Sequence, residues 1–144
     1  VLPFGITSIT DSAGTLLYQR AGEGLGQVVA PETVATMNRM LVQVLSRGTG
    51  TAAAFNFPAA GKTGTSSDFR DAWFMGFTAN YVTGVWVGND DGADMKGVTG
   101  GGLPAQIWHD VMASAHEGLE PRSLPGFEPQ DPGMIGRLLQ VFTD

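Results

Sequence analysis

The residues most suited to chemistry form one short run near the middle of the chain, Gly61-Lys62-Thr63-Gly64-Thr65. The sequence contains only two lysines, and this one stands among glycines and hydroxyl residues. Glycines are unfavourable in a strand unless a ligand or another backbone comes close to it. A lysine beside hydroxyl groups can hold an anion, and the free N–H groups of a strand edge can bind a ligand backbone or an oxyanion. The run therefore predicts a binding strand at the edge of a sheet.

Two other interpretations of the same run compete with this one. A phosphate-binding loop needs glycine where Asn56 stands, and Pro58 lies inside the would-be loop. A helix should follow such a loop, whereas an aromatic, β-favouring run follows here from Ala72 to Thr78. The spacing thus disfavours a phosphate loop. As a bare pentapeptide, the run is also compatible with a simple turn that carries a solvated lysine.

Two hairpins that would position this strand are predicted from β-favouring runs around turn residues. The first joins Ile6–Thr10 to Thr15–Gln19 through Asp-Ser-Ala-Gly. The second joins Asp71–Thr78 to Tyr81–Asn89 through a two-residue turn. Glycines inside the second hairpin indicate the close approach of a backbone or of large side chains, at Gly76, Gly84 and Gly88.

Two helices are predicted from apolar residues at helical spacing. The first begins at Pro31 and is capped by Gly48, and the second runs from about Pro104 to His116 and ends at Gly118. The apolar face of the first comprises Val34, Met37, Met40, Leu41, Val44 and Leu45, and that of the second comprises Ile107, Trp108, Val111, Met112 and Ala115. A Pro-rich tail follows, with one further short helix predicted over Arg137–Phe142. The order of elements describes an α+β domain, an antiparallel β-sheet with packed helices.

Composition excludes several classes of protein. The chain has 144 residues and a formal charge of −6, which argues against nucleic-acid binding because that needs clustered cations. Without cysteine there are no disulfides, thiolate metal sites or thiol nucleophiles. The two histidines, His109 and His116, lack a ligand pattern and are expected to be solvated, and the loop with Asp90, Asp91 and Asp94 lacks the closing glutamate of a calcium loop. No metal, cofactor or membrane segment is predicted.

The wider context of the lysine run resembles the C-terminal part of the transpeptidase domain of class A penicillin-binding proteins, of the penicillin-binding protein 1A type. The resemblance rests on ordered motifs: GKTGTSSDFRDAWFMGF, then VTGVWVGNDD, then GGLPAQIWHDVM. The segments PFGITSITDSAGTLLYQR and PETVATMNRMLVQVLSRGTGTAAA precede them as that family's hairpin and helix do. It covers about residues 3–116. It implies a partial serine β-lactamase/transpeptidase-like fold over residues 1–118, followed by a Pro-rich tail over 119–144.

The resemblance also implies roles for individual residues in one wall of an active site. Lys62 would raise the positive potential of the cleft, and Thr63 and Thr65 would bind the terminal carboxylate of a substrate or of a β-lactam. Gly64 would let the acyl group lie against the strand, and the Thr65 N–H would form half of an oxyanion hole. The implied reaction is serine acyl transfer from D-alanyl-D-alanine stem peptides, which cross-links peptidoglycan on the periplasmic, outer face of the bacterial cytoplasmic membrane.

Two further residues match the family's Asp-x-Trp-Phe run. Asp71 is predicted to support the end of a strand, and Trp73 is predicted to pack in the core. Other aromatic residues are also predicted to pack in the core or in strands, namely Phe55, Phe57, Phe74, Phe77 and Trp86.

Two motifs of the family are missing from this sequence. No serine is followed three residues later by lysine, so the Ser-x-x-Lys nucleophile box is absent, and so is Ser-x-Asn. Because the chain also opens with Val1 rather than methionine, it is expected to be a truncated piece that neither turns over substrate nor reacts with penicillin alone. Alternatives are a non-catalytic carboxylate- or peptide-binding module and a fragment of a β-lactamase or D,D-carboxypeptidase; the upstream reading frame would distinguish them.

Truncation has a predicted structural consequence. The strand Tyr81–Asn89 would lose its neighbour at one edge, and the helix with Trp108 would lose its packing partner. Unpaired edges and uncovered apolar faces favour association. The chain is therefore expected to form a dimer or a strand-swapped oligomer.

Overall fold

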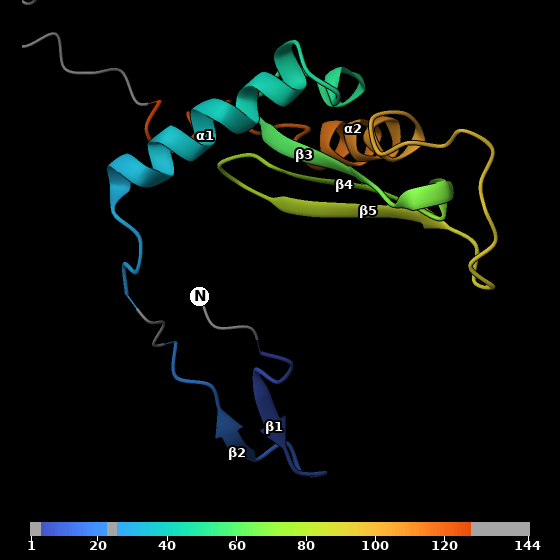
Figure 1. Cartoon of the computed structure of the whole chain (residues 1–144). Helices are drawn as coiled ribbons and strands as arrows, with labels where there is room; N and C mark the ends of the chain where they lie inside the picture. The colour runs from blue at the N-terminus through green and yellow to red at the C-terminus, as the bar shows by residue number, and fades with distance from the viewer. Residues whose placement is uncertain (1–3, 23–25, 128–144) are drawn as a thin grey trace, which may run out of the picture. The chain divides into compact units, whose positions relative to one another are not determined.

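The computed structural model of the protein describes residues 4–22 and 26–127. Contacts divide the chain into two compact units, Val1–Ala30 and Pro31–Asp144 (Figure 1). The short helix predicted over Arg137–Phe142 lies outside the described residues. Neither helix in the described part of the chain has the length and apolar character needed to cross a bilayer.

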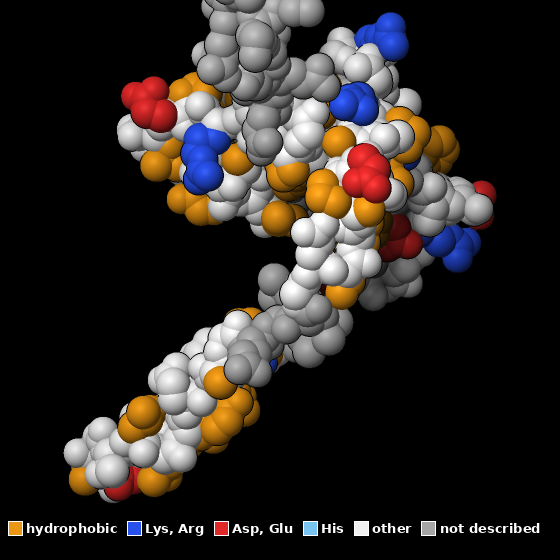
Figure 2. All heavy atoms as spheres, turned by 90° about the vertical axis from the view of Figure 1, so that its left-hand side faces the viewer, with side chains coloured by type: hydrophobic (Ala, Val, Ile, Leu, Met, Phe, Trp, Pro, Cys, Tyr) orange, Lys and Arg blue, Asp and Glu red, His pale blue; other side chains and the backbone are white. Residues whose placement is uncertain are grey.

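In its described residues, 4–22 and 26–30, the first unit contains one small antiparallel hairpin. Strand β1 spans Ser8–Thr10 and strand β2 spans Leu16–Gln19, and every residue of both is exposed. Hydrophobic side chains therefore lie on the surface of this unit (Figure 2). The turn is held by the Asp11 carboxylate, which accepts the N–H groups of Ala13 and Thr15, each at 2.8 Å. These contacts, led by the Thr15 amide, lower the pKa of Asp11 below the ordinary value of an aspartate. The first predicted hairpin is thus confirmed.

The second unit, over its described residues 31–127, contains a three-stranded antiparallel sheet and two helices. Its elements in chain order are α1 (Pro31–Ser46), the short 3₁₀ turn η1 (Thr51–Ala53), β3 (Ala60–Thr65), the 3₁₀ turn η2 (Ser67–Phe69), β4 (Asp71–Phe77), β5 (Val82–Gly88) and α2 (Leu103–Ala115). The strand order is β3-β4-β5, so the second predicted hairpin is confirmed as the pair β4–β5. Figure 1 shows α1 lying above β3 and α2 behind the sheet. The predicted α+β class is confirmed.

One face of the sheet and both helices form the hydrophobic core. Directly paired residues share a face, and the face of Phe74 is the buried one. Phe74 packs edge-on against Trp108 of α2, with ring centroids 5.2 Å apart, and Leu45 of α1 belongs to the same cluster. A Cβ on Gly76 would lie 2.7 Å from the Trp108 ring, so this strand position requires glycine. The predicted close approach at this glycine is confirmed.

The expectation that the second helix lacks a packing partner is wrong. Trp108 is fully buried, and its Nε1–H donates to the Thr83 carbonyl of β5 at 3.1 Å. The sheet within this chain is sufficient to cover the indole. The buried face of α2 is narrower than predicted, because Ile107 and Val111 remain 37% and 49% exposed.

The opposite face of the sheet is open. Trp73 was predicted to lie in the core, but it is 44% exposed because strand alternation places it on the face opposite Phe74. It pairs with Trp86 across β4 and β5, with ring centroids 6.3 Å apart. The Trp86 Nε1–H donates to Asp71 at 2.9 Å, which fits the predicted support role of that carboxylate at the strand end.

The first helix buries only part of the predicted face, in which Leu45 is buried as expected. Met37 and Met40 were expected in the core but are 50% and 55% exposed, whereas Asn38 is buried. The cause is the segment after α2, which returns to α1: the Asn38 side chain donates to the Pro125 carbonyl at 3.0 Å, and Leu124 is 1% exposed. Part of the predicted Pro-rich tail therefore packs on the second unit.

His116 is buried rather than solvated, which corrects the prediction from sequence. It is 2% exposed, and its Nδ1 lies 2.7 Å from the Met112 carbonyl. Because a carbonyl can only accept, Nδ1 carries the proton, and Nε2 accepts from the Thr78 hydroxyl at 2.9 Å. That hydroxyl oxygen also accepts the N–H groups of Asn80 and Tyr81. His116 thus joins the end of α2 to the β4–β5 turn.

Candidate functional site

The predicted binding strand is β3, and it lies at an edge of its sheet. Among the described residues, β3 pairs only with β4. Just after β3, the Ser66 N–H donates to the Asp71 carbonyl at 2.9 Å, so it points toward β4. Because successive main-chain groups of a strand point to opposite sides, the Thr65 N–H points away from β4 to the open edge. The Lys62 ammonium donates to the Thr63 main-chain carbonyl at 2.7 Å. The main-chain groups of Thr63 therefore point to the same open edge as the Thr65 N–H.

The side chains of this strand alternate between the two faces of the sheet. Lys62 and Gly64 stand opposite Met75 and Trp73, on the open face. Thr63 and Thr65 project from the other face, the one on which the helices pack. The strand therefore presents its open main-chain edge and its two threonine hydroxyls together.

Beside these hydroxyls lies an open hollow of about 470 Å³. We call it the hydroxyl-lined hollow, and its lining consists of Thr49, Thr63, Thr65, Thr99, Gly101 and Gly102. The lining offers hydroxyl and main-chain groups and no charged side chain. The Oγ1 atoms of Thr49 and Thr63 are 2.7 Å apart, and the Gly100 N–H donates to the Thr65 Oγ1 at 3.1 Å.

The loop after α1 brings Thr49 to the hollow. Helix α1 ends at Ser46, and Gly48 is not the left-handed cap predicted, because its φ is not positive. Glycine is needed there for another reason: a Cβ would lie 2.8 Å from the Val44 Cα. Gly50 then donates its N–H to the Val44 carbonyl at 2.9 Å. The two glycines let the chain turn tightly over the helix end and place Thr49 next to β3.

The turn before α2 forms the opposite wall, and sequence reasoning missed its role. A Cβ on Gly100 would collide with the Trp73 carbonyl, and a Cβ on Gly101 would collide with the Thr49 carbonyl. Only glycine permits this approach to β3. In the sequence, only the aspartates of the loop before this turn were weighed, as possible calcium ligands. Three consecutive glycines directly before a helix were the signal that could have indicated a close backbone contact.

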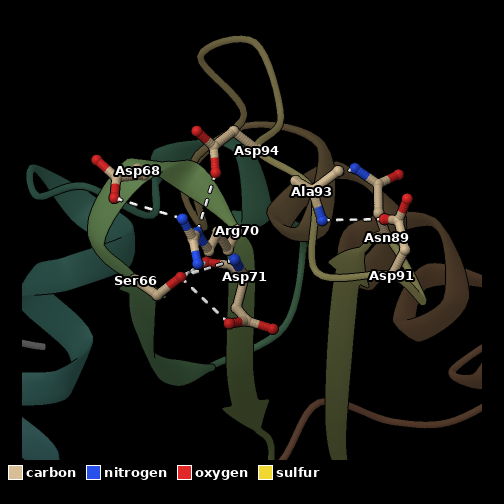
Figure 3. A network of polar contacts seen from close by, with 8 residues as sticks. All are labelled: Ser66, Asp68, Arg70, Asp71, Asn89, Asp91, Ala93 and Asp94. Carbon is tan, nitrogen blue, oxygen red and sulfur yellow. Dashed lines mark hydrogen bonds and ion pairs between the residues drawn. The ribbon is translucent and has the colours of Figure 1, made fainter.

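The turn between β3 and β4 is fixed by its neighbours, as Figure 3 shows. Asp68 and Phe69 both have left-handed φ values, 59° and 56°, which non-glycine residues rarely adopt. Arg70 donates through Nε to Asp94 at 2.9 Å, and the Met95 N–H donates to the Phe69 carbonyl at 3.2 Å. Through these two bonds, the loop after β5 fixes the position of the turn that follows β3.

Two acidic residues of that loop have local partners. Asp94 pairs with Arg70, and Asp91 accepts the Ala93 N–H at 2.9 Å (Figure 3). Across residues 4–22 and 26–127, no group of three metal-ligating side chains comes together.

The family model of the penicillin binding protein transpeptidase domain matches residues 2–113 of the chain. This chain belongs to the penicillin-binding protein transpeptidase family. The resemblance inferred from the motifs around Lys62 is confirmed.

Relatives in this family are similar across the same region. Penicillin-binding protein 1A of Aquifex aeolicus is 38% identical over 111 residues, covering 76% of this chain and 15% of the relative. Penicillin-binding protein 4 of Bacillus subtilis is 35% identical over 112 residues, covering 77% of this chain and 18% of the relative. The chain thus spans less than a fifth of the curated relatives it matches.

Two solved structures are similar in fold over most of this chain. The D,D-transpeptidase domain of a peptidoglycan glycosyltransferase from Eggerthella lenta is 28% identical, with a TM-score of 0.57 over 77% of this chain and 26% of that one. Penicillin-binding protein 1A of Haemophilus influenzae has a TM-score of 0.64 over 86% of this chain and 25% of that one. The latter is 23% identical and supports the fold alone. The expected partial transpeptidase fold is confirmed.

Proposed function

We propose that this chain supplies one wall of a peptidoglycan D,D-transpeptidase site, the wall that binds the terminal carboxylate of D-alanyl-D-alanine or of a β-lactam. The observation that carries the proposal is the convergence on one hollow of two strand hydroxyls, Thr63 and Thr65, beside an open main-chain edge. The complete reaction would be serine acyl transfer that cross-links stem peptides, on the outer, periplasmic face of the bacterial cytoplasmic membrane.

The chemistry of the hollow suits a carboxylate. A carboxylate only accepts hydrogen bonds, and bonds from hydroxyl or amide donors to a charged acceptor are stronger than neutral ones. No carboxylate side chain lines the hollow to repel an anion. Gly64 adds no side chain to the strand, and the Lys62 ammonium at the Thr63 carbonyl adds positive charge at the edge.

The open edge also suits acyl transfer. The Thr65 N–H, directed away from β4, would donate to the oxyanion that forms on the attacked carbonyl. A rigid, preoriented donor of this kind typically contributes about 3 kcal/mol in the transition state. Since the sequence has no Ser-x-x-Lys, the nucleophile would come from outside these 144 residues. The absence of this motif also supports a second candidate function, carboxylate binding without catalysis.

Binding can be tested on the chain itself. We expect ¹⁵N-labelled protein titrated with N-acetyl-D-alanyl-D-alanine to show amide shifts at Thr63, Thr65 and the glycines beside the hollow, and much smaller shifts with the C-terminal carboxamide of the same peptide. Thr65→Val should weaken carboxylate binding about tenfold, because it removes one donor to a charged group. Thr36→Val is the matched control, since its hydroxyl bonds only the Glu32 carbonyl on α1.

Two results would contradict the proposal. If no shift appears at β3, or if acid and carboxamide bind alike, the hollow is not a carboxylate site. Intact-mass analysis after incubation with penicillin should show no covalent adduct of the isolated chain. A stoichiometric adduct would refute the inference that the nucleophile lies elsewhere.

We also propose that the isolated chain self-associates through β5. Among the described residues β5 pairs only with β4, so its outer edge is open, and Val82 on it is 77% exposed. Open strand edges pair with other chains. Light scattering should show a mass that rises toward a dimer with concentration, and Val82→Lys should lower it. A monomeric mass at every concentration would refute the proposal.

A further inference from the structure

The two strand hydroxyls of the hollow are each bonded by a group from outside the sheet, but in different ways. Thr65 receives the Gly100 N–H on its oxygen at 3.1 Å. Because an amide N–H can only donate, the Thr65 hydroxyl proton remains available for another acceptor. The turn before α2 therefore fixes Thr65 as a donor toward the hollow.

Thr63 is bonded by a second hydroxyl instead of an amide. Its Oγ1 lies 2.7 Å from the Thr49 Oγ1, and either oxygen can be the donor. If Thr49 donates, the Thr63 proton is available to a ligand, just as that of Thr65 is. If Thr63 donates, its proton is used within the protein and a carboxylate in the hollow loses one partner.

Close packing of the main chain fixes the position of Thr49. It stands between two glycines that pack tightly on the end of α1, and Gly50 is buried. Gly101 packs directly against the Thr49 carbonyl, where a Cβ would collide. With its main chain fixed from both sides, Thr49 keeps its hydroxyl against Thr63.

We propose that Thr49 is a positioning residue that donates to Thr63 and thereby directs the Thr63 hydroxyl proton at the ligand carboxylate. This inference rests on the proposed carboxylate-binding function and extends it to a loop outside the KTGT strand, Lys62–Thr65. A bound carboxylate offers only acceptors, so it selects the state in which Thr49 donates. Thr49 thus makes the site prefer a carboxylate over a ligand group that can itself donate a hydrogen bond.

Comparing the carboxylate ligand with its carboxamide distinguishes a positioning role of Thr49 from a purely structural role. A carboxamide carries N–H donors, so it can satisfy the Thr63 oxygen after Thr49 is removed, whereas a carboxylate cannot. Loss of the Thr49 hydroxyl should therefore weaken the acid more than the amide. A residue that only tied the α1 loop to β3 would weaken both ligands equally.

The experiment compares Thr49→Val, which removes the hydroxyl at nearly constant shape, with Thr49→Ser, which keeps it. In NMR titrations of the full chain, Thr49→Val should lower affinity for N-acetyl-D-alanyl-D-alanine by about five- to tenfold, as expected for a weakened bond to a charged group. Affinity for the carboxamide should change less than twofold. Thr49→Ser should restore the preference for the acid.

A ligand-free measurement tests the same contact independently. Three-bond couplings to the Thr63 methyl carbon report its χ1 angle. They should indicate one rotamer in the wild type and in Thr49→Ser, and rotamer averaging in Thr49→Val. If Thr49→Val does not fold, Thr49→Ala is measured in its place. A folded variant in which Thr63 keeps the single χ1 rotamer of the wild type overturns the inference.

The outcomes distinguish this inference from the function on which it rests. If the wild type binds neither ligand, the proposed function fails and this inference fails with it. If the wild type prefers the acid and Thr49→Val keeps that preference, only the role of Thr49 is overturned. Equal weakening of both ligands, with a lower melting temperature, would also overturn it and assign Thr49 to structure.

Discussion

The two hairpins of this protein arise from similar sequence signals but differ completely in burial. In β1–β2 every strand residue is exposed. In β4–β5 the two faces differ: Phe74 is fully buried under the helices, while Trp73 on the other face is 44% exposed. A two-stranded hairpin alone is marginally stable in water, whereas one that packs on a helix can anchor a core. Turn chemistry therefore determines where a hairpin forms, and packing determines how strongly it is held.

The β4–β5 hairpin also positions the candidate site. It holds β3 along the whole length of that strand, through six paired positions from Ala60 to Thr65. The loop that leaves β5 fixes the β3–β4 turn through Arg70 and Asp94. Stability of the core and geometry of the site are thus linked in the second unit.

The largest expected effect comes from removing the helix contact that distinguishes β4–β5. Trp108→Ala deletes a fully buried indole that packs on Phe74 and bonds the Thr83 carbonyl. Buried tryptophan truncations cost about 3–5 kcal/mol, so the second unit should be strongly destabilised or unfolded. Urea denaturation followed by fluorescence or circular dichroism measures the loss. Amide shifts of β1–β2 should remain unchanged.

Trp86→Ala provides the matched control on the open face of the same hairpin. Trp86 is 42% exposed, and its removal deletes the contact with Trp73 and the bond to Asp71. An aromatic pair and one hydrogen bond suggest a loss of about 1–2 kcal/mol. If the two tryptophan variants lose equal stability, the contrast between the two faces is wrong.

The positions of elements could be predicted because their signals are local. Pro31 begins α1 as expected, and both hairpins lie where turn residues separate β-favouring runs. The second helix begins at Leu103, one residue before the predicted Pro104. The edge strand around Lys62 could be predicted because its glycines and lysine are adjacent in sequence.

The contacts that complete the site could not be predicted because they join distant segments. Thr49 meets Thr63 from 14 residues away, and Gly100 reaches Thr65 over 35 residues. Thr49 is not unusual in its own neighbourhood, and the glycine run that contains Gly100 indicates a close contact without indicating its partner. The buried His116 was missed for the same reason, since the hydroxyl that satisfies it lies 38 residues earlier. Local patterns indicate which residues are polar, but only tertiary packing indicates which polar groups meet.

The smallest expected effect concerns β1–β2 and depends on pH. Its turn is held by the Asp11 carboxylate, and the Thr15 and Ala13 amides favour the ionised form, which lowers the pKa of Asp11 below 3.8. A carboxyl whose pKa is lowered by folding contributes stability above the unfolded pKa and loses it as pH falls through the folded one. Below pH 3.8 the hairpin should therefore weaken, with the Ala13 and Thr15 amide shifts moving toward random-coil values.

Asp11→Asn is the control for this titration, because its side-chain oxygen can still accept both amides but does not ionise in this range. Its hairpin should be slightly weaker at neutral pH and insensitive to acid. The carboxylate is fully exposed, so solvent screens its contacts and the effect stays smaller than either tryptophan substitution in β4–β5. If the wild-type hairpin shifts stay constant through this acid range, the turn does not depend on the charge of Asp11. The exposed hairpin would then be held by its backbone pairing alone.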